Sequence, residues 1–323
     1  MALDTELTRR LGITYPIVSA PMAFAAGGRL AAAVTAAGGL GLIGGGYGDP
    51  VWLAQEFRAA GNTPVGCGFI TWALASNPQL LDQVLEHRPR AIFLSFGDPE
   101  SFASSVKHAG SLLMCQVQTR RDADHALTCG ADIIVAQGAE AGGHGERRST
   151  FTLVPEVADL IASRGSAALL CAAGGIADGR GVAAALMLGA DGVVVGSRFW
   201  ATQEASVNPR MHWRALVASG DDTVRSRAMD IARRLAWPER YTARVLRNAF
   251  TERWHGREEE LRAAADEEAI KYRQAWLEGD PDNSNTFIGE AVGLIKSIEP
   301  AGEVLQRMAC EAAELLSGTR PRT

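Results

Sequence analysis

Short apolar runs alternate eight times with stretches of helical spacing between residues 16 and 199 of this 323-residue chain. Within the runs the apolar residues are nearly continuous, which is typical of parallel strands that helices cover on both faces. Eight is also the strand number of a closed parallel barrel. The pattern therefore predicts an α/β fold, a TIM (β/α)8 barrel, with strands at residues 17–20, 40–43, 65–69, 91–95, 112–116, 133–136, 168–172 and 192–196.

Stretches rich in Ala and Leu between these runs have the spacing of helices. They occupy residues 30–37, 79–85, 123–127, 157–162 and 182–188. Glycines follow several of them, at positions where a helix C-cap would turn the chain back into the next strand. These glycines are Gly38, Gly39, Gly110, Gly130, Gly165 and Gly189.

The character of the sequence changes after Trp200, where the strand runs stop and the charge density rises. We expect charged helices over residues 223–269, a loop over 277–284 and an amphipathic helix over 292–316. This divides the chain into a barrel at 1–200, a helical lid or substrate-pocket appendage at 201–290, and a C-terminal helix at 291–323 that packs back on the barrel. Tryptophans of this part either line a pocket or anchor helices, and packing is the commoner role; they are Trp213, Trp237, Trp254 and Trp276.

Charge and hydrophobicity exclude several classes of partner. The net charge is −5 and no basic stripe is present, so we expect neither nucleic acid nor an anionic membrane surface. No run of about 18 apolar residues occurs, and the first residues lack the pattern of a signal peptide. The cysteines lack CxxC spacing and several lie in apolar runs, which favours a cytoplasmic protein; they are Cys67, Cys115, Cys129, Cys171 and Cys310.

The loop after the sixth run, residues 136–145, contains four glycines around His144. Glycines at the end of a buried strand expose backbone N–H groups and let a planar or phosphorylated ligand approach the main chain. His144 would then handle a proton or an anion. The alternative is a glycine-rich turn with an incidental histidine. Glu140 and Ser95 are further candidates near this site, and we expect the remaining histidines to be surface residues, namely His87, His108, His125, His212 and His255.

Two further glycine loops follow the seventh and eighth runs, where TIM barrels commonly hold phosphate. Gly174 and Gly175 would open a helix whose N-terminal amides bind an anion, and Gly196 and Ser197 would add an amide and a hydroxyl. We expect Asp178 to cap the helix, and Arg180 and Arg198 to form surface ion pairs.

A phosphate at strands seven and eight and a histidine loop at strand six together suit a phosphorylated planar cofactor over the barrel mouth. Flavin mononucleotide (FMN) fits best. A Rossmann GxGxxG motif is lacking after the first strand, and no histidine or cysteine cluster has metal-ligand spacing, so we expect no dinucleotide fold and no metal.

Five motifs together resemble the nitronate monooxygenase family, formerly called 2-nitropropane dioxygenases. Their superfamily also contains FMN-dependent enoyl-acyl carrier protein reductases and NAD(P)H:quinone reductases. The resemblance runs in register from residue 13 to 199, and a weaker match lies at 287–294. The motifs are Ala20-Pro21-Met22 and the segments 38–41, 138–145, 173–179 and 196–199.

The resemblance implies FMN at the C-terminal face of the barrel, with His144 as the catalytic histidine. It implies that main-chain groups around Ala20, Pro21 and Met22 meet the flavin ring, and that Gln116 and Gln137 face it. Gly143 would lie near the phosphate or ribitol. The remaining cofactor contacts implied are Phe69, Gly142, Ala173, Gly174, Gly175, Gly196 and Ser197. At the third strand many members carry an Asn near the flavin, whereas this chain reads Gly68-Phe69-Ile70-Thr71.

The family resemblance implies oxidation of alkyl nitronates, and of nitroalkanes, by dioxygen to a carbonyl compound and nitrite. His144 would remove the α-proton of a nitroalkane or orient the nitro oxygens. The alternative is an NAD(P)H-dependent FMN reductase that acts on a quinone or an enoyl thioester. A third class is a non-catalytic flavin-binding protein. Assembly as a homodimer stays open.

Overall fold

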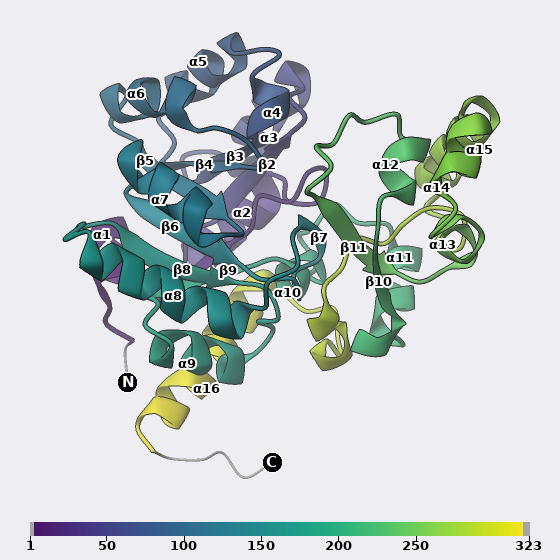
Figure 1. The fold of residues 1–323 in the computed structure, drawn as a ribbon. Helices are drawn as coiled ribbons and strands as arrows, with labels where there is room; N and C mark the ends of the chain where they lie inside the picture. The colour runs from purple at the N-terminus through teal and green to yellow at the C-terminus, as the bar shows by residue number, and fades with distance from the viewer. Residues whose placement is uncertain (1–2, 319–323) are drawn as a thin grey trace.

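Eight parallel strands form the barrel of this computed structural model, which describes residues 3–318 (Figure 1). Their order around the barrel is β1-β9-β8-β6-β5-β4-β3-β2. A parallel bridge between Val18 and Leu40 joins the two ends of this order and closes the circle. The strands are β1 (Ile17–Ser19), β2 (Leu42–Gly46), β3 (Gly66–Ile70), β4 (Ala91–Ser95), β5 (Leu112–Val117), β6 (Ile133–Gln137), β8 (Leu169–Ala173) and β9 (Gly192–Val195). All eight predicted strands are confirmed.

Both faces of these strands are buried, as the continuous apolar runs predicted. In β4, Phe93 points into the barrel, while Ile92 and Leu94 pack outward against the helices. Helix α1 (Glu6–Leu11) adds Leu7 and Leu11 to the inner core. Apolar residues on two faces therefore build one core inside the barrel and a second between strands and helices.

Helices connect successive strands on the outside of the barrel (Figure 1). The five predicted helices are confirmed as α2 (Gly28–Ala36), α5 (Gln79–Glu86), α7 (Arg120–Thr128), α8 (Thr150–Ser163) and α9 (Gly179–Met187). The prediction left out α3 (Pro50–Ala60) and α6 (Glu100–His108). Gly38, Gly110, Gly130, Gly165 and Gly189 have φ values of 101°, 77°, 79°, 58° and 96°, as expected of left-handed helix ends.

The segment after Trp200 contains strands, so the prediction of helices alone was wrong. β10 (Thr223–Ser226) and β11 (Thr242–Leu246) form an antiparallel sheet with β7 (Gly143–Gly145), a strand from the glycine loop after β6. The two later strands mix apolar and polar residues, and Arg225, Thr242 and Arg244 are only partly buried, which hid these strands among charged residues.

Helices surround this small sheet, and Figure 1 shows them as a green group beside the barrel. We call residues 201–290 the lid. Its elements besides the strands are α11 (Pro209–Leu216), η1 (Gly220–Asp222), α12 (Ala228–Ala232), α13 (Ala249–Trp254), α14 (Glu258–Ala263) and α15 (Ala265–Glu278), with η2 (Glu290–Leu294) at its end.

The chain returns to the barrel in α16 (Ala301–Leu316), which packs against α9 and α2. Short helices α4 (Thr71–Leu74) and α10 (Ser197–Trp200) follow β3 and β9 directly. Within residues 3–318 no helix combines the length and the apolar character needed to cross a membrane. The division at residues 200 and 290 stays a prediction.

Candidate active site

A cavity of about 410 Å³ lies at the C-terminal ends of the barrel strands. This volume is within the range of about 300–1,000 Å³ typical of small-molecule sites. All fourteen predicted site residues line it, although they come from six barrel strands and the loops that follow them. They are Ala20, Pro21, Met22, Phe69, Gln116, Gln137, Gly142, Gly143, His144, Ala173, Gly174, Gly175, Gly196 and Ser197. The structure brings them together, and their individual roles stay predictions.

Two glycines before His144 have different reasons to be glycine. A Cβ on Gly142 would lie 2.5 Å from the backbone carbon of Ile288, so no side chain fits. Gly143 has φ +72°, and a Cβ there would meet nothing within 4 Å. The first glycine therefore permits close packing of the lid, and the second bends the backbone and leaves open space beside it.

The loop after β8 corrects the predicted anion site. Gly174 and Gly175 have φ values of 103° and 76°, but α9 begins only at Gly179. Asp178 caps that helix by accepting the N–H groups of Arg180 and Gly181, as predicted. The N–H of Gly179 donates to Glu311 Oε2 at 3.0 Å. The first amides of α9 are therefore occupied, and the expectation that the glycines open a helix for an anion was wrong.

Other amides near the same loops remain available. Within residues 3–318, the N–H groups of Gly175 and Ile176 donate to no protein acceptor, and the first N–H groups of α10 have no partner within their own helix. Ser197 Oγ accepts the N–H of Gly289 at 2.9 Å, so its own proton is free to be donated. These donors can bind a phosphate.

His144 lies in β7 and is buried, with 8% of its surface exposed. Its Nε2 lies 3.0 and 2.9 Å from the two carboxylate oxygens of Asp230, in α12 of the lid. The imidazole stacks on the ring of Trp237, with centroids 3.4 Å apart and planes 5° apart. Sequence reasoning missed Asp230, because 86 residues separate it from His144.

The charge state of His144 follows from its surroundings. Burial lowers the pKa of the imidazole below its usual 6.5, and Asp230 opposes this effect without cancelling it. Arg233 and Arg225 lower the pKa further. His144 is therefore neutral at neutral pH.

Three glutamines form a chain beside the histidine. Gln137 Oε1 accepts the amide N–H groups of Gln116 at 3.2 Å and of buried Gln118 at 2.9 Å. This arrangement orients the Gln137 side chain, whose NH2 group can then serve as a donor in the cavity. Gln118 was not predicted.

Aromatic side chains and one cation form the wall on the lid side of the cavity. Trp237 Nε1 donates to Tyr47 Oη at 3.0 Å, and the guanidinium of Arg233 lies 5.3, 5.9 and 5.6 Å from the ring centroids of Tyr47, Trp276 and Phe287. Trp237 and Trp276 line the cavity, and buried Trp237 also packs in a core cluster, so it takes both expected roles. Packing, the preferred role, is also found for buried Trp254, whereas Trp213 is 66% exposed and fits neither role.

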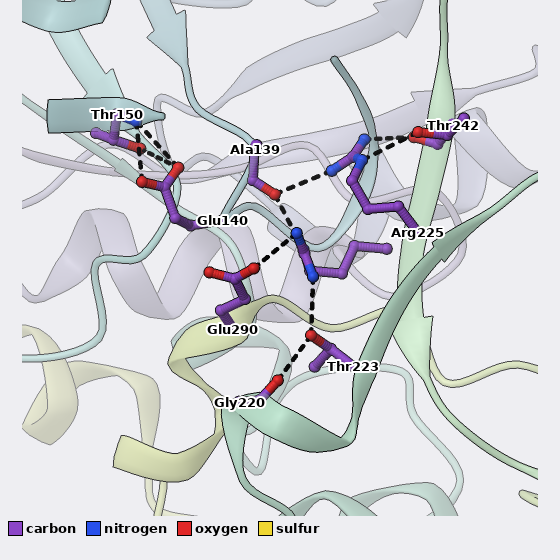
Figure 2. A network of polar contacts seen from close by, with 9 residues as sticks. Ala139, Glu140, Thr150, Gly220, Thr223, Arg225, Thr242 and Glu290 are labelled. Carbon is purple, nitrogen blue, oxygen red and sulfur yellow. Dashed lines mark hydrogen bonds and ion pairs between the residues drawn. The ribbon is translucent and has the colours of Figure 1, made fainter. Parts of the chain in front are cut away.

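Figure 2 shows how the loop after β6 is fixed to the lid. Arg225 Nη1 and Arg244 Nε both donate to the carbonyl oxygen of Ala139, at 3.0 and 2.9 Å. Arg244 also pairs with Glu290 at 2.7 Å. Burial lowers the pKa of Arg225 to about 10, so this guanidinium stays charged at neutral pH, and burial also lowers the pKa of Arg244 below its usual range, opposed by Glu290. Two cations therefore hold the backbone that leads to His144.

Glu140 and Ser95 both line the cavity, but each is engaged in the fold. Glu140 accepts the N–H and the hydroxyl of Thr150 at the start of α8, and Ser95 Oγ donates to the carbonyl oxygen of Phe69 at 3.0 Å. The side chain of Phe69 belongs to the outer core, and the residue also lines the cavity. Thr71 Oγ1 is buried without a partner among residues 3–318.

Several polar residues lie elsewhere than predicted or outside the site. Arg180 pairs with Asp178 at the surface as expected. Arg198 also forms an ion pair, with Glu299 at 3.4 Å, but it is buried and donates to the carbonyl oxygen of Ser297 at 3.0 Å, so its surface location was wrong. His212 is also buried, 2.9 Å from the carbonyl oxygen of Trp200, so its prediction as a surface residue was wrong. The other four histidines are exposed.

Outside the cavity, Asp98, His125 and Cys129 bring ligand-type atoms within 4.8 Å of one another, a cluster that the spacing did not predict.

Comparison with known proteins shows the family to which the chain belongs. The family model for nitronate monooxygenase matches residues 4–67 and 69–311, and the omitted residue, Gly68, lies in β3 where the predicted departure falls. A nitronate monooxygenase of Neurospora crassa is 36% identical over 92% of this chain and 89% of its own length.

Two solved structures share the fold over nearly their whole length. FabK of Thermotoga maritima has a TM-score of 0.85 and 33% identity, and the match covers 98% of both chains. A nitroalkane oxidase of Streptomyces ansochromogenes has a TM-score of 0.80 and 26% identity, with 97% of this chain and 99% of that chain covered. With its barrel, its glycine loops and its buried histidine, the chain belongs to the nitronate monooxygenase family.

Proposed function

We propose that this protein uses FMN to oxidise alkyl nitronates and nitroalkanes with dioxygen, giving a carbonyl compound and nitrite. The observation that carries the proposal is the neutral, buried His144 on the wall of a cavity at the C-terminal face of the barrel. Membership in the nitronate monooxygenase family, an FMN-dependent oxidoreductase family, supports it.

The cavity fits FMN in the chemistry of its donors. The free N–H groups of Gly175 and Ile176, together with the hydroxyl of Ser197, would hold the phosphate, and Gly143 leaves room beside the backbone. Gln116 and Gln137 would face the ring. When bound, FMN supplies the electron acceptor, while the protein supplies position and field.

His144 performs the proton step in this proposal. With a neutral nitroalkane, its imidazole accepts the α-proton: the C–H bond breaks, an N–H bond forms, and the electron pair spreads onto the nitro oxygens. The imidazolium then stabilises the negative charge on those oxygens. With a nitronate the proton is already absent, so this proton step is not needed.

The wall of the cavity strengthens these interactions. Phe96, Tyr241 and Trp237 pack against one another next to the histidine, with ring centroids 5.1 to 6.1 Å apart. Aromatic rings exclude water, and a low dielectric increases the effect of the imidazolium charge on the nitro group.

The test is oxygen uptake by the purified, FMN-loaded protein with ethyl nitronate, followed together with nitrite. We expect nitrite to appear only while oxygen is consumed. Absence of both reactions in a protein that is saturated with FMN would overturn the proposed function.

The second candidate is an NAD(P)H-dependent reductase, favoured by the likeness to FabK. It would take a hydride from NADH or NADPH and pass it to a quinone or an enoyl thioester. Anaerobic mixing separates the two activities: rapid bleaching of the flavin by a pyridine nucleotide supports the reductase, and an unchanged flavin supports the monooxygenase.

We also propose a cytoplasmic location, supported by the cysteines. Cys67, Cys115 and Cys171 are buried in strands as free thiols, and Cys129 and Cys310 are also free. Free thiols are usual in a reducing compartment. A homodimer stays a proposal without an assigned surface, and light scattering of the purified protein tests it.

A further inference from the structure

The lid places a carboxylate directly against the histidine. Asp230 and His144 are 3% and 8% exposed, and both Asp230 oxygens lie at hydrogen-bond distance from Nε2. Among residues 3–318, His144 Nε2 is the only side-chain group that is hydrogen-bonded to this carboxylate. We propose that Asp230 is a positioning residue for His144, which fixes Nδ1 as the proton-accepting atom and offsets the charge that the ring gains.

The tautomer follows from the contact. A carboxylate only accepts hydrogen bonds, so Nε2 must carry a hydrogen and donate it. In the neutral ring, Nδ1 then carries the lone pair. Within residues 3–318, His144 Nδ1 has no hydrogen-bond partner, and this atom is not fully buried. It therefore opens onto the cavity that His144 lines. Asp230 therefore turns the basic nitrogen toward the substrate space.

Two contacts fix the ring itself. Asp230 holds one edge, and the indole of Trp237 covers one face at a centroid distance of 3.4 Å. Phe96 adds an edge contact at 6.2 Å. Rotation about either side-chain torsion would break the stack or the hydrogen bonds, so Nδ1 is held in one place before a substrate arrives.

Asp230 also stabilises the protonated state of His144. A buried carboxylate without a paired charge is costly, and so is an isolated buried imidazolium. When Nδ1 takes a proton, the ring becomes the counter-ion of Asp230, and each charge then compensates the other. The pair of Asp230 and His144, which we call the dyad, therefore makes proton uptake feasible in a site from which aromatic side chains exclude water.

The inference rests on the proposed function and extends it to the form of the substrate. A neutral nitroalkane must lose a proton, whereas a nitronate arrives without it. Asp230 should therefore matter strongly for nitroalkanes and weakly for nitronates. The lid residue decides how well the enzyme uses the neutral form.

The main experiment compares D230N with the wild type on nitroethane and on ethyl nitronate. Asparagine keeps the shape, but its amide can donate to Nε2 and so place the hydrogen on Nδ1; the equivalent change in serine proteases lowers kcat about 10⁴-fold. We expect kcat/KM for nitroethane to fall about 10²- to 10⁴-fold. With ethyl nitronate we expect a loss of less than about 10-fold, because no proton is removed there.

The pH profile adds a readout that a purely structural role would not move. The groups facing His144 are Asp230 and Arg233 from the α12 region, and Arg225 from β10. Removal of the Asp230 charge leaves both arginines and the burial, all of which lower the pKa of His144. The acid limb of nitroethane turnover should therefore move to lower pH in D230N.

Two further variants complete the design. D230E keeps a carboxylate and should recover most of the nitroethane activity relative to D230N. D266N removes another lid carboxylate, which pairs with Arg234 at the surface, and should match the wild type. Equal losses of D230N on both substrates, or an unmoved acid limb, would overturn the positioning role.

NMR titration of the imidazole separates failure of this inference from failure of the proposed function. The His144 signals, assigned by comparison with H144Q, should report a proton on Nε2 in the wild type and a lower pKa in D230N. This measurement needs no turnover. Identical spectra and titrations in the two proteins would contradict the dyad even if nitronate oxidation is confirmed.

Discussion

At the scale of single residues, one imidazole combines burial, a fixed tautomer and access to the cavity. His144 could be identified from its sequence neighbours, since four glycines around one histidine after a buried strand indicate a ligand loop. Asp230 and Trp237 could not, because only the folding of the lid brings them to the ring. The histidine was therefore recognisable from its neighbours in the sequence, whereas the residues that orient it lie far from it along the chain.

The substitution H144Q tests the role of this imidazole. Glutamine can still hydrogen-bond to Asp230 but accepts no proton at neutral pH. We expect FMN to remain bound, nitroethane turnover to fall about 10²- to 10⁴-fold, and ethyl nitronate turnover to fall much less. Steady-state rates with both substrates and the flavin spectrum measure this, and unchanged nitroethane turnover would contradict the assigned role.

The pH dependence belongs to the same residue. Because burial holds the pKa of His144 below its usual 6.5, the neutral form that accepts a proton predominates at neutral pH. For nitroethane, kcat/KM should rise with pH through an acid limb below 6.5 and be level at neutral pH, if the imidazole carries the step. A limb at or above 6.5 would show instead that Asp230 outweighs burial.

At the scale of elements, the strands differ in how well their sequences predict them. The eight barrel strands are apolar on both faces and were recognised from that pattern. β10 and β11 carry Arg225 and Arg244 on one face, and these side chains are engaged with Ala139 instead of solvent. Their charged character suggested helices. The start of α9 was also misplaced, since Asp178 and not the preceding glycines marks it.

The contacts of Arg225 and Arg244 with the carbonyl oxygen of Ala139 (Figure 2), which we call the clamp, give a prediction at this scale. In R244M, Ala139 loses one of its two arginine donors and Glu290 loses its partner. We expect the free energy of unfolding to fall by about 1.5–3 kcal/mol, the usual value of a hydrogen bond to a charged group. FMN affinity should also fall, because the same loop leads to Gly143.

Urea unfolding and flavin titration measure both effects. R247M is the matched control, since Arg247 is exposed in the lid and the contacts to Ala139 and Glu290 come from Arg225 and Arg244 instead. If R244M and R247M behave alike, the clamp does not support the loop.

At the scale of the whole molecule, β7 connects the barrel with the lid, because it follows β6 in the chain but belongs to the small sheet β10-β11-β7. This strand leaves the barrel after β6, pairs with β11 and carries His144 between the two parts. Ligand binding at such a junction should stabilise both parts together. We therefore expect FMN to raise the midpoint of thermal unfolding in a single transition.

Removal of FMN tests this coupling. At a free FMN concentration 100 times the Kd, binding adds about 2.7 kcal/mol to the stability of the native state. Calorimetry of the protein without FMN should show a lower midpoint of thermal unfolding. The midpoint should rise to its original value as FMN is added. Separate transitions for barrel and lid, with only one responding to FMN, would contradict a shared site.

The most direct test of the account is a crystal structure of the protein with FMN bound. The account predicts the phosphate on the amides of Gly175 and Ile176 and on Ser197, with the flavin ring beside Gln116 and Gln137 and Nδ1 of His144 open to the space next to it. A phosphate on the first turn of α9, or an imidazole turned away from the ring, would contradict it.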